Sequence, residues 1–208
     1  MDASSAPQPS PSASGRAALL IVDVQRDFCP GGALPAPGCL RIIAPLNAYL
    51  ARARALRMPV YASRDWHPAV TTHFKAYGGP WPPHCVQGTE GAEFHPSLEL
   101  PPDTIVVSKG DDPERPGYSA FEGRTPDGRP LADDLRHRGI AHLYVAGLTT
   151  DYCVRQTVLD GLAAGLRVTV LTDAVAAIDA RPGDGEQALA EMSAKGAALA
   201  SGADSLAA

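Results

Sequence analysis

Short apolar runs alternate with amphipathic segments along most of this chain. Residues 17–22 read AALLIV, a run that is typical of a strand buried on both faces of a parallel sheet. From Ile42 to Leu56 the apolar side chains recur at steps of three and four residues, which predicts an amphipathic helix. The same reading predicts further strands at 58–62, 104–108, 142–147 and 166–171, further helices at 131–138, 153–164 and 185–195, and a candidate last strand at 197–200.

This alternation predicts an α/β fold with three α/β/α layers, in which right-handed crossovers join the strands of a mostly parallel sheet. In such sheets ligands bind beyond the carboxyl ends of the strands. Polar or turn-forming residues follow four of the predicted strands at that end, namely Asp23, 64–65, Lys109 and 147–153. We therefore expect the functional site at this edge of the sheet.

The pattern also divides the chain into a tail and one domain. Residues 1–15 contain no Ile, Leu, Val or Phe and are rich in Ser and Pro, which predicts a disordered N-terminal tail. Residues 16–208 are enough for a single domain with a sizeable core. Within that domain, residues 64–102 are irregular and rich in Pro, Gly and His, and a compact domain rarely contains so long a loop without a function for it.

Composition and charge argue against several classes of protein. The 208 residues carry 18 basic and 23 acidic side chains, a net charge of −5, so a surface for nucleic acid is not expected. The run at 17–22 is too short to span a bilayer, and the residues before it do not form a signal-peptide pattern. Four cysteines without a CxxC spacing are too few for a disulfide scaffold. We therefore expect a cytoplasmic protein that contacts no membrane.

Cys153 is a candidate nucleophile because it begins a predicted helix directly after a strand and a turn. The free N–H groups and partial positive charge of a helix start favour a thiolate and can hold an oxyanion. The alternative is a buried structural cysteine, the role expected of Cys29, Cys39 and Cys85.

A nucleophilic thiol needs a base and a stabilising charge. Asp23 and Lys109, one of only three lysines, both end predicted strands and could supply them, although a lone Asp there is more often a turn or cap.

A second group of candidate residues lies in the long loop. Asp65 and His67 are followed by His73 and His84, and carboxylate and imidazole are ligands of first-row transition metals. The spacing of Asp65 and His67 places both side chains on one side of an extended segment. A solvated polar loop is the alternative reading. The remaining histidines lack such neighbours and are expected to be ordinary ones; they are His95, His137 and His142.

Together these motifs resemble the nicotinamidase branch of the isochorismatase-like cysteine hydrolases. Four stretches carry the resemblance, which extends over residues 17–192: DVQRDF at 23–28, DWH at 65–67 with His73 and WPPHC at 81–85, KG at 109–110 with YSAFE at 118–122, and DYCVRQT at 151–157. The Asp, Lys and Cys motifs are general to the superfamily. The Asp-x-His loop is narrower and favours the nicotinamidase branch.

The resemblance implies an amidohydrolase that converts nicotinamide to nicotinic acid and ammonia through a cysteine acyl-enzyme and also accepts pyrazinamide. It implies a catalytic set, an oxyanion hole made by two backbone N–H groups after a cis peptide bond, a site for zinc or iron, and aromatic residues packed on the pyridine ring. The catalytic residues would be Asp23, Lys109 and Cys153; the oxyanion hole Thr149 and Cys153; the metal ligands Asp65, His67, His73 and His84; and the ring contacts Phe28, Trp81 and Tyr118.

Some features leave alternatives open. The segment 111–116 is longer than the family pattern suggests, which weakens the assignment of Tyr118, and Phe28 could simply pack in the core. The rival functions are an amidase for another small carbamoyl or ureido compound, a hydrolase in which a metal activates water and Cys153 is structural, and an inactive binding module. The expected partner is a small-molecule substrate, and the sequence is compatible with a homo-oligomer.

Overall fold

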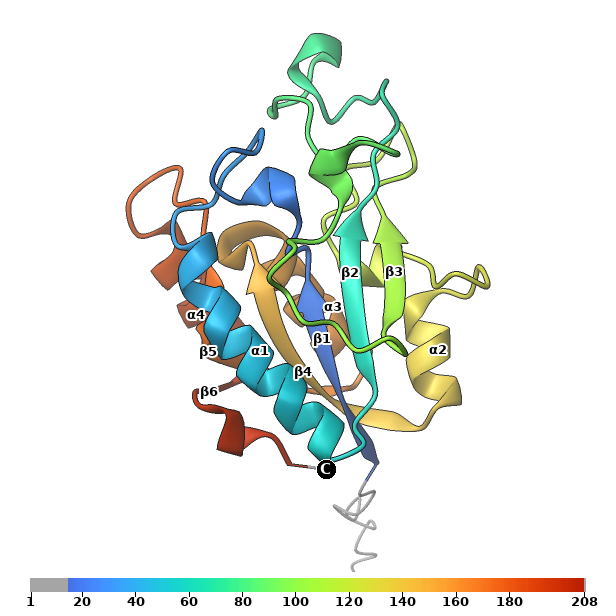
Figure 1. Ribbon diagram of the computed structural model, residues 1–208, viewed down its shortest axis with the longest axis vertical. Coiled ribbons are helices and arrows are strands. Elements are labelled where there is room, and N and C mark those ends of the chain that lie inside the picture. Colours follow the sequence, from blue (N-terminus) through green and yellow to red (C-terminus); the bar gives the residue numbers. More distant parts are fainter. Residues whose placement is uncertain (1–14, 208) are drawn as a thin grey trace, which may run out of the picture.

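The structure is a computed structural model that describes residues 15–207. The predicted disordered tail therefore lies outside the described residues, apart from Gly15. Six strands form one sheet in the order β3-β2-β1-β4-β5-β6, and each neighbouring pair is parallel (Figure 1). The strands are β1 Arg16–Val22, β2 Val60–Asp65, β3 Ile105–Lys109, β4 Ile140–Leu148, β5 Arg167–Ala176 and β6 Ala198–Ala200.

Helices cover both faces of the sheet and confirm the three-layer prediction. The helices are α1 Cys39–Ala55, α2 Leu131–His137, α3 Arg155–Ala163 and α4 Asp184–Ala194. Leu19 and Ile21 of β1 belong to the core under α1, whereas Leu20 and Val22 belong to the core shared with α2, α3 and α4 (Figure 1). Burial on both faces explains why residues 17–22 are uniformly apolar.

Most predicted bounds shift by three residues or fewer, and three elements differ in ways that the structure explains. Strand β2 continues to Asp65 although its last residues are polar, because they pair with β3. Strand β5 extends to Ala176 because pairing with β4 resumes after an irregularity between Val145 and Gly147. The helix expected at 153–164 is divided into a π-helical turn at Thr150–Val154 and α3.

The strand register places the polar residues side by side. Asp65 of β2 is the register partner of Lys109 of β3, and both end their strands. Val22, the last residue of β1, pairs with Ser63 on one side and Gly147 on the other. The carboxyl ends of the four strands β1–β4 therefore meet, as the sequence predicted, and the loop after β2 extends above them (Figure 1).

The structure pairs two cysteines that the sequence left as separate structural residues. Cys29 and Cys39 form a disulfide that closes the loop between β1 and α1, and Cys85 and Cys153 are free. Ten positions separate the paired residues, and the sequence offered no framework that would select this pair. Among residues 15–207, no helix has both the length and the apolar character required to cross a membrane.

Asp134 of α2 is a buried carboxylate that ties this helix to the sheet. It accepts hydrogen bonds from the Tyr61 hydroxyl of β2 (2.7 Å), Arg138 Nε (2.6 Å) and Arg129 (3.2 Å). Burial alone would raise the pKa of Asp134, but the hydrogen bonds from Arg138 and Tyr61 outweigh it and lower the pKa. The ionised form therefore stabilises the fold above the ordinary pKa of an aspartate and loses this effect as the pH falls through the lowered value.

We expect Asp134→Asn to reduce the free energy of unfolding by about 1–3 kcal/mol near neutral pH, because a buried hydroxyl and two arginines lose their charged acceptor. Urea unfolding measures the loss, which should shrink as wild-type Asp134 itself becomes protonated in acid. Asp133→Asn is the matched control: Asp133 and its partner Arg136 are both exposed, so this change should stay within about 0.5 kcal/mol. Equal losses in the two variants would contradict this account.

Candidate active site

The Lys109 side chain is fully buried between two carboxylates at the carboxyl ends of β1–β3. Its Nζ lies 2.8 Å from Asp23 Oδ2 and 2.5 Å from Asp65 Oδ1. It also donates to the carbonyl of Gly117 at 3.1 Å. Asp23 follows β1 directly, with a left-handed backbone (φ +50°). The sequence predicted the neighbours Asp23 and Lys109, but assigned Asp65 only to a metal.

The charges of this cluster depend on one another. Burial alone would lower the pKa of Lys109, but Asp23 and Asp65 outweigh it and hold that pKa well above its usual value. Burial likewise opposes ionisation of Asp65, yet Lys109 outweighs it and lowers the pKa of Asp65. For Asp23, burial dominates and raises the pKa despite Lys109. Asp65 is thus the firmly ionised carboxylate and Asp23 the one better able to accept a proton and return it.

Cys153 completes the cluster from the turn after β4. Its Sγ lies 3.5 Å from Lys109 Nζ, and its thiol, Asp23 and Asp65 all offer atoms within 4.8 Å of one another. The turn is π-helical because the Val154 N–H bonds to the Thr149 carbonyl, five residues back. Cys153 therefore lies inside this turn and not at the start of α3.

The electrostatic prediction for Cys153 is wrong in direction. Burial raises the pKa of its thiol well above the usual value, and Lys109 offsets this only in part. The sequence correctly places Cys153 in the segment that follows a strand. A predicted place at a helix start does not show that the thiol is almost completely buried. A neutral thiol at rest needs a base within reach, and Asp23 is placed to serve.

Two polar residues that sequence reasoning missed fix the carboxylates. Ser63 Oγ donates to Asp23 Oδ1 at 2.7 Å. The Gln25 side chain accepts from the Asp65 N–H and donates to the Asp65 carbonyl, both at 2.8 Å. Both lie within two residues of a carboxylate, Ser63 on β2 before Asp65 and Gln25 after Asp23. Their closeness in sequence to a candidate carboxylate is the one feature that could have identified them.

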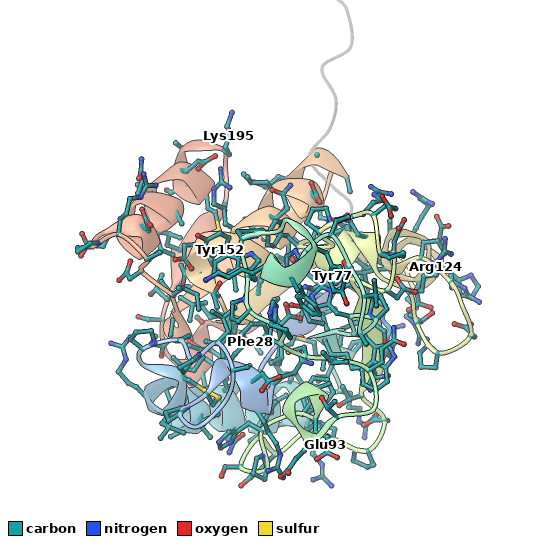
Figure 2. All side chains as sticks on the ribbon, turned by 90° about the horizontal axis from the view of Figure 1, so that it is seen from above. Phe28, Tyr77, Glu93, Arg124, Tyr152 and Lys195 are labelled. Atoms are coloured by element: carbon teal, nitrogen blue, oxygen red, sulfur yellow. A yellow bond between two sulfur atoms is a disulfide. The ribbon has the colours of Figure 1, made fainter. Side chains whose placement is uncertain are left out.

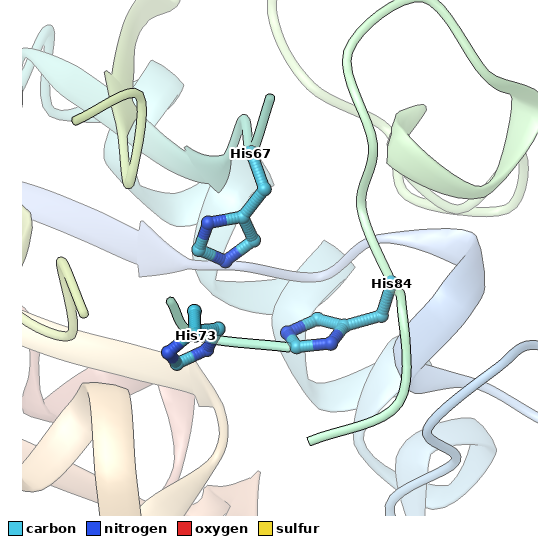
Figure 3. Close-up of side chains that lie close together, drawn as sticks. All are labelled: His67, His73 and His84. Atoms are coloured by element: carbon cyan, nitrogen blue, oxygen red, sulfur yellow. The ribbon is translucent and has the colours of Figure 1, made fainter. Parts of the chain in front are cut away.

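The three loop histidines converge beside Asp65. The rings of His67, His73 and His84 point toward a common space (Figure 3), and one ring nitrogen of each lies within 4.8 Å of the others. The Nε2 atoms of His67 and His84 lie 3.6 and 3.8 Å from Asp65 Oδ2. Asp65 therefore contacts Lys109 with one oxygen and faces the histidines with the other.

These side chains fit a divalent transition metal ion. The carbonyls of Gly110 and Pro82 lie 2.9 and 2.8 Å from Nδ1 of His67 and His84, which leaves each Nε2 free toward the common space. His67 Nε2 is buried without a hydrogen-bond partner, which is costly unless a ligand occupies that position. Burial, together with His67 and His84, lowers the pKa of His73 to about 3. Three imidazoles and one carboxylate form a suitable donor set.

A small pocket joins the thiol to the histidine cluster. The residues that line it are Phe28, Leu34, Asp65, His73, Trp81, His84, Tyr118, Thr149, Tyr152, Cys153 and Ile178. The three predicted ring contacts are all present. Leu34, Tyr152 and Ile178 were not predicted: Tyr152 is adjacent to the nucleophile candidate, whereas the other two lie in loops without a sequence pattern. Viewed from above, Phe28 and Tyr152 lie nearer the middle of the molecule than Glu93, Arg124 and Lys195 (Figure 2).

Tyr118 reaches the pocket despite the long segment 111–116. The ends of this segment close on each other, since a Cβ on Gly117 would lie 2.5 Å from the Cα of Gly110. Tyr118 Oη accepts a hydrogen bond from Trp81 Nε1 at 2.9 Å, and the Trp81 ring meets Tyr152 edge-on. The length of this segment therefore does not keep Tyr118 out of the pocket.

Thr149 lies in the same pocket, directly after a cis peptide bond. The bond joins Leu148 to Thr149, where the family resemblance implied one. Thr149 is buried, and its carbonyl accepts from the N–H groups of Tyr152 and Val154. The backbone at the end of β4 is thereby tied to the turn that carries Cys153.

Comparisons with known proteins agree with this geometry. A family model described as the isochorismatase domain matches residues 17–204. The chain is 43 % identical over 166 residues to a nicotinamidase/pyrazinamidase of Mycobacterium tuberculosis, covering 78 % of this chain and 88 % of that protein. It is 40 % identical over 203 residues to a nicotinamidase of Escherichia coli, covering 90 % and 95 %. The crystal structure of a pyrazinamidase of Pyrococcus horikoshii in complex with zinc superimposes with a TM-score of 0.83 at 44 % identity, covering 90 % and 99 %.

Iodoacetamide should label Cys153 at least about tenfold faster than Cys85 in the native protein, because Cys153 lines a pocket and has a base beside it, whereas Cys85 is fully buried. Cys29 and Cys39 should not react while their disulfide is intact. Peptide mapping after partial alkylation measures the ratio, and alkylation after unfolding gives the intrinsic rates as the control. Comparable labelling of Cys85 and Cys153 in the native protein would contradict the predicted reactivity.

Proposed function

Because this chain belongs to the isochorismatase family, we propose that it is an amidohydrolase that converts nicotinamide to nicotinic acid and ammonia. One observation carries the proposal: a thiol that lines a small aromatic pocket lies beside a proton-accepting carboxylate and a buried ammonium, and the same pocket reaches a histidine cluster suited to a metal ion. The nicotinamidase and pyrazinamidase relatives support the substrate class, and pyrazinamide is expected to react as well.

The first step uses Asp23 as a base. Asp23 accepts the thiol proton of Cys153 while Lys109 stabilises the negative charge that passes between them. The sulfur then attacks the carboxamide carbon, and the electron pair of the C=O bond moves to the oxygen. The backbone N–H groups of Thr149 and Cys153 receive this oxyanion.

Asp23 then acts as an acid. It returns the proton to the amide nitrogen as the C–N bond breaks, so that ammonia and not an amide anion departs. Water attacks the resulting thioester of Cys153, and Asp23 accepts a proton from that water. The C–S bond then breaks, and nicotinic acid leaves as the proton returns to the sulfur.

The remaining pocket residues bind and orient the ring. Asp65, His67, His73 and His84 would hold zinc or iron; the zinc complex of the Pyrococcus relative supports zinc. A divalent ion held by these residues would offer a coordination position to the ring nitrogen of the substrate. The ring contacts are assigned to Phe28, Trp81 and Tyr118. A cytoplasmic location and assembly into a homo-oligomer stay predictions from the sequence.

Cys153→Ala should lower kcat for ammonia release from nicotinamide by at least about 10³-fold, because the other pocket residues cannot form the acyl intermediate. Asp23→Asn should have a comparable effect, since an amide cannot accept the thiol proton. A coupled ammonia assay measures both. Asp103→Asn is the matched control, because Asp103 is exposed just before β3, at the opposite end of the sheet. Substantial turnover by Cys153→Ala would refute the assignment of Cys153 as the nucleophile.

Benzamide separates the proposed role of the metal site from direct metal hydrolysis. It has the amide and shape of nicotinamide but not the ring nitrogen, so its kcat/KM should be roughly 30- to 1,000-fold lower. His84→Ala or a chelator should severely reduce the nicotinamide rate and leave the slow benzamide rate almost unchanged.

The rival functions give different results in the same assay. If a metal-activated water attacked the amide, metal removal would abolish both reactions and Cys153→Ala would spare them. Rapid benzamide hydrolysis by the intact enzyme would refute the ring-nitrogen role. Inactivity on both amides, with turnover of a carbamoyl or ureido compound, would identify the other amidase class, and inactivity on all of them would indicate a binding module.

A further inference from the structure

The carboxylate of Asp151 holds a loop that forms part of the pocket wall. Asp151 Oδ1 accepts from the Ile178 N–H at 3.1 Å, and Oδ2 accepts from the Asp179 N–H at 2.9 Å. Ile178 lines the pocket. It lies beyond the end of β5 at Ala176, so the hydrogen bonds of the sheet do not hold it. Its position therefore depends on these two hydrogen bonds and on packing.

The held loop connects β5 to α4. Asp179 adopts a left-handed backbone (φ +52°), and its Oδ1 accepts from the Gly185 N–H at 2.8 Å. A non-glycine residue adopts this conformation only where its surroundings stabilise it. The Asp151 carboxylate thus receives two successive N–H groups at the point where the chain leaves the sheet and passes along the pocket.

The two hydrogen bonds from Ile178 and Asp179 to Asp151 form a clamp between two segments. One segment is the loop after β5, and the other is the turn that carries Cys153. Asp151 belongs to the π-helical turn Thr150–Val154, beside Tyr152 and Cys153. Thr149 anchors this turn through its carbonyl, which accepts from Tyr152 and Val154. Asp151 consequently fixes Ile178 relative to the reacting sulfur. Two oxygens are required for the two N–H donors, which a carboxylate provides and an amide side chain does not.

We propose that Asp151 is a positioning residue that sets the width of the substrate pocket by holding Ile178 against it. This inference rests on the proposed function. It assigns specificity for a flat, unsubstituted six-membered ring to the Asp151–Ile178 contact. Loss of the clamp releases the wall, weakens binding of the small ring and admits rings that carry an added methyl group.

The test compares Asp151→Ala, Asp151→Asn, Ile178→Ala and the double variant Asp151→Ala/Ile178→Ala. Asp151→Ala should raise KM for nicotinamide about tenfold, the effect of losing one or two net hydrogen bonds, with kcat within about threefold. Asp151→Asn retains one acceptor and should fall between wild type and Asp151→Ala. Both Asp151→Ala and Ile178→Ala should raise kcat/KM for ring-methylated nicotinamides relative to nicotinamide.

The double variant distinguishes positioning from general support of the fold. If Asp151 acts through Ile178, adding Asp151→Ala to Ile178→Ala should change KM by less than about twofold. Asp160→Ala on α3 is the matched control, because the Asp160 carboxylate accepts a hydrogen bond from Gln156 of its own helix and does not line the pocket, and it should leave KM unchanged. A fall in kcat at constant KM, or a full effect of Asp151→Ala in the Ile178→Ala background, would overturn the proposal.

Amide hydrogen exchange tests the clamp without any substrate. In Asp151→Ala, exchange at Ile178 and Asp179 should accelerate at least about tenfold. In Asp151→Asn, one of these two amides should accelerate more than the other. Unchanged exchange at both amides would overturn the clamp. If wild type does not hydrolyse nicotinamide, the proposed function fails while the exchange result still decides the clamp. If Asp151→Ala does not fold, Asp151→Asn carries both measurements.

Discussion

The buried Lys109 ammonium is the group on which the rest of the site depends. A lone charge in this position would be strongly unfavourable, and breaking a buried pair typically costs about 3–5 kcal/mol. Asp23 and Asp65 compensate it together, at 2.8 and 2.5 Å. Because Asp65 also faces the histidines with its second oxygen, one ammonium connects the thiol side of the pocket to the histidine side.

The parallel sheet explains how these groups meet. Asp65 and Lys109 end β2 and β3, Asp23 follows β1 directly, and the register pairs Asp65 with Lys109. Cys153 joins them from the turn after β4. The loops then supply what strands cannot: the imidazoles, the aromatic walls and the backbone carbonyls that orient them. Gly110 contributes one such carbonyl, and its contact with Gly117 keeps the next aromatic residue, Tyr118, in the pocket.

The sequence predicted the layers, most of the strands and the convergence of Asp23, Lys109 and Cys153, because continuous apolar runs mark buried strands and the residue after a run lies at the sheet edge. It did not predict the pairing of Lys109 with Asp65. That pairing depends on strand order and register, which an alternating pattern does not specify.

Other features depend on tertiary contacts that the local sequence does not encode. The raised pKa of Cys153 follows from burial by distant segments. Leu34 and Ile178 lie in irregular loops, where periodicity carries no information. The Cys29–Cys39 disulfide likewise requires the folded path of the loop between β1 and α1.

In the proposed reaction, turnover passes through a thioester on Cys153, and hydroxylamine can compete with water for that thioester. Nicotinamide and methyl nicotinate differ only in the leaving group, so both would give the same acyl-enzyme. A shared acyl-enzyme should give an identical ratio of hydroxamate to nicotinic acid from the two substrates at a given hydroxylamine concentration. A ratio that differs between the substrates would mean that water attacks them directly, and would contradict the account.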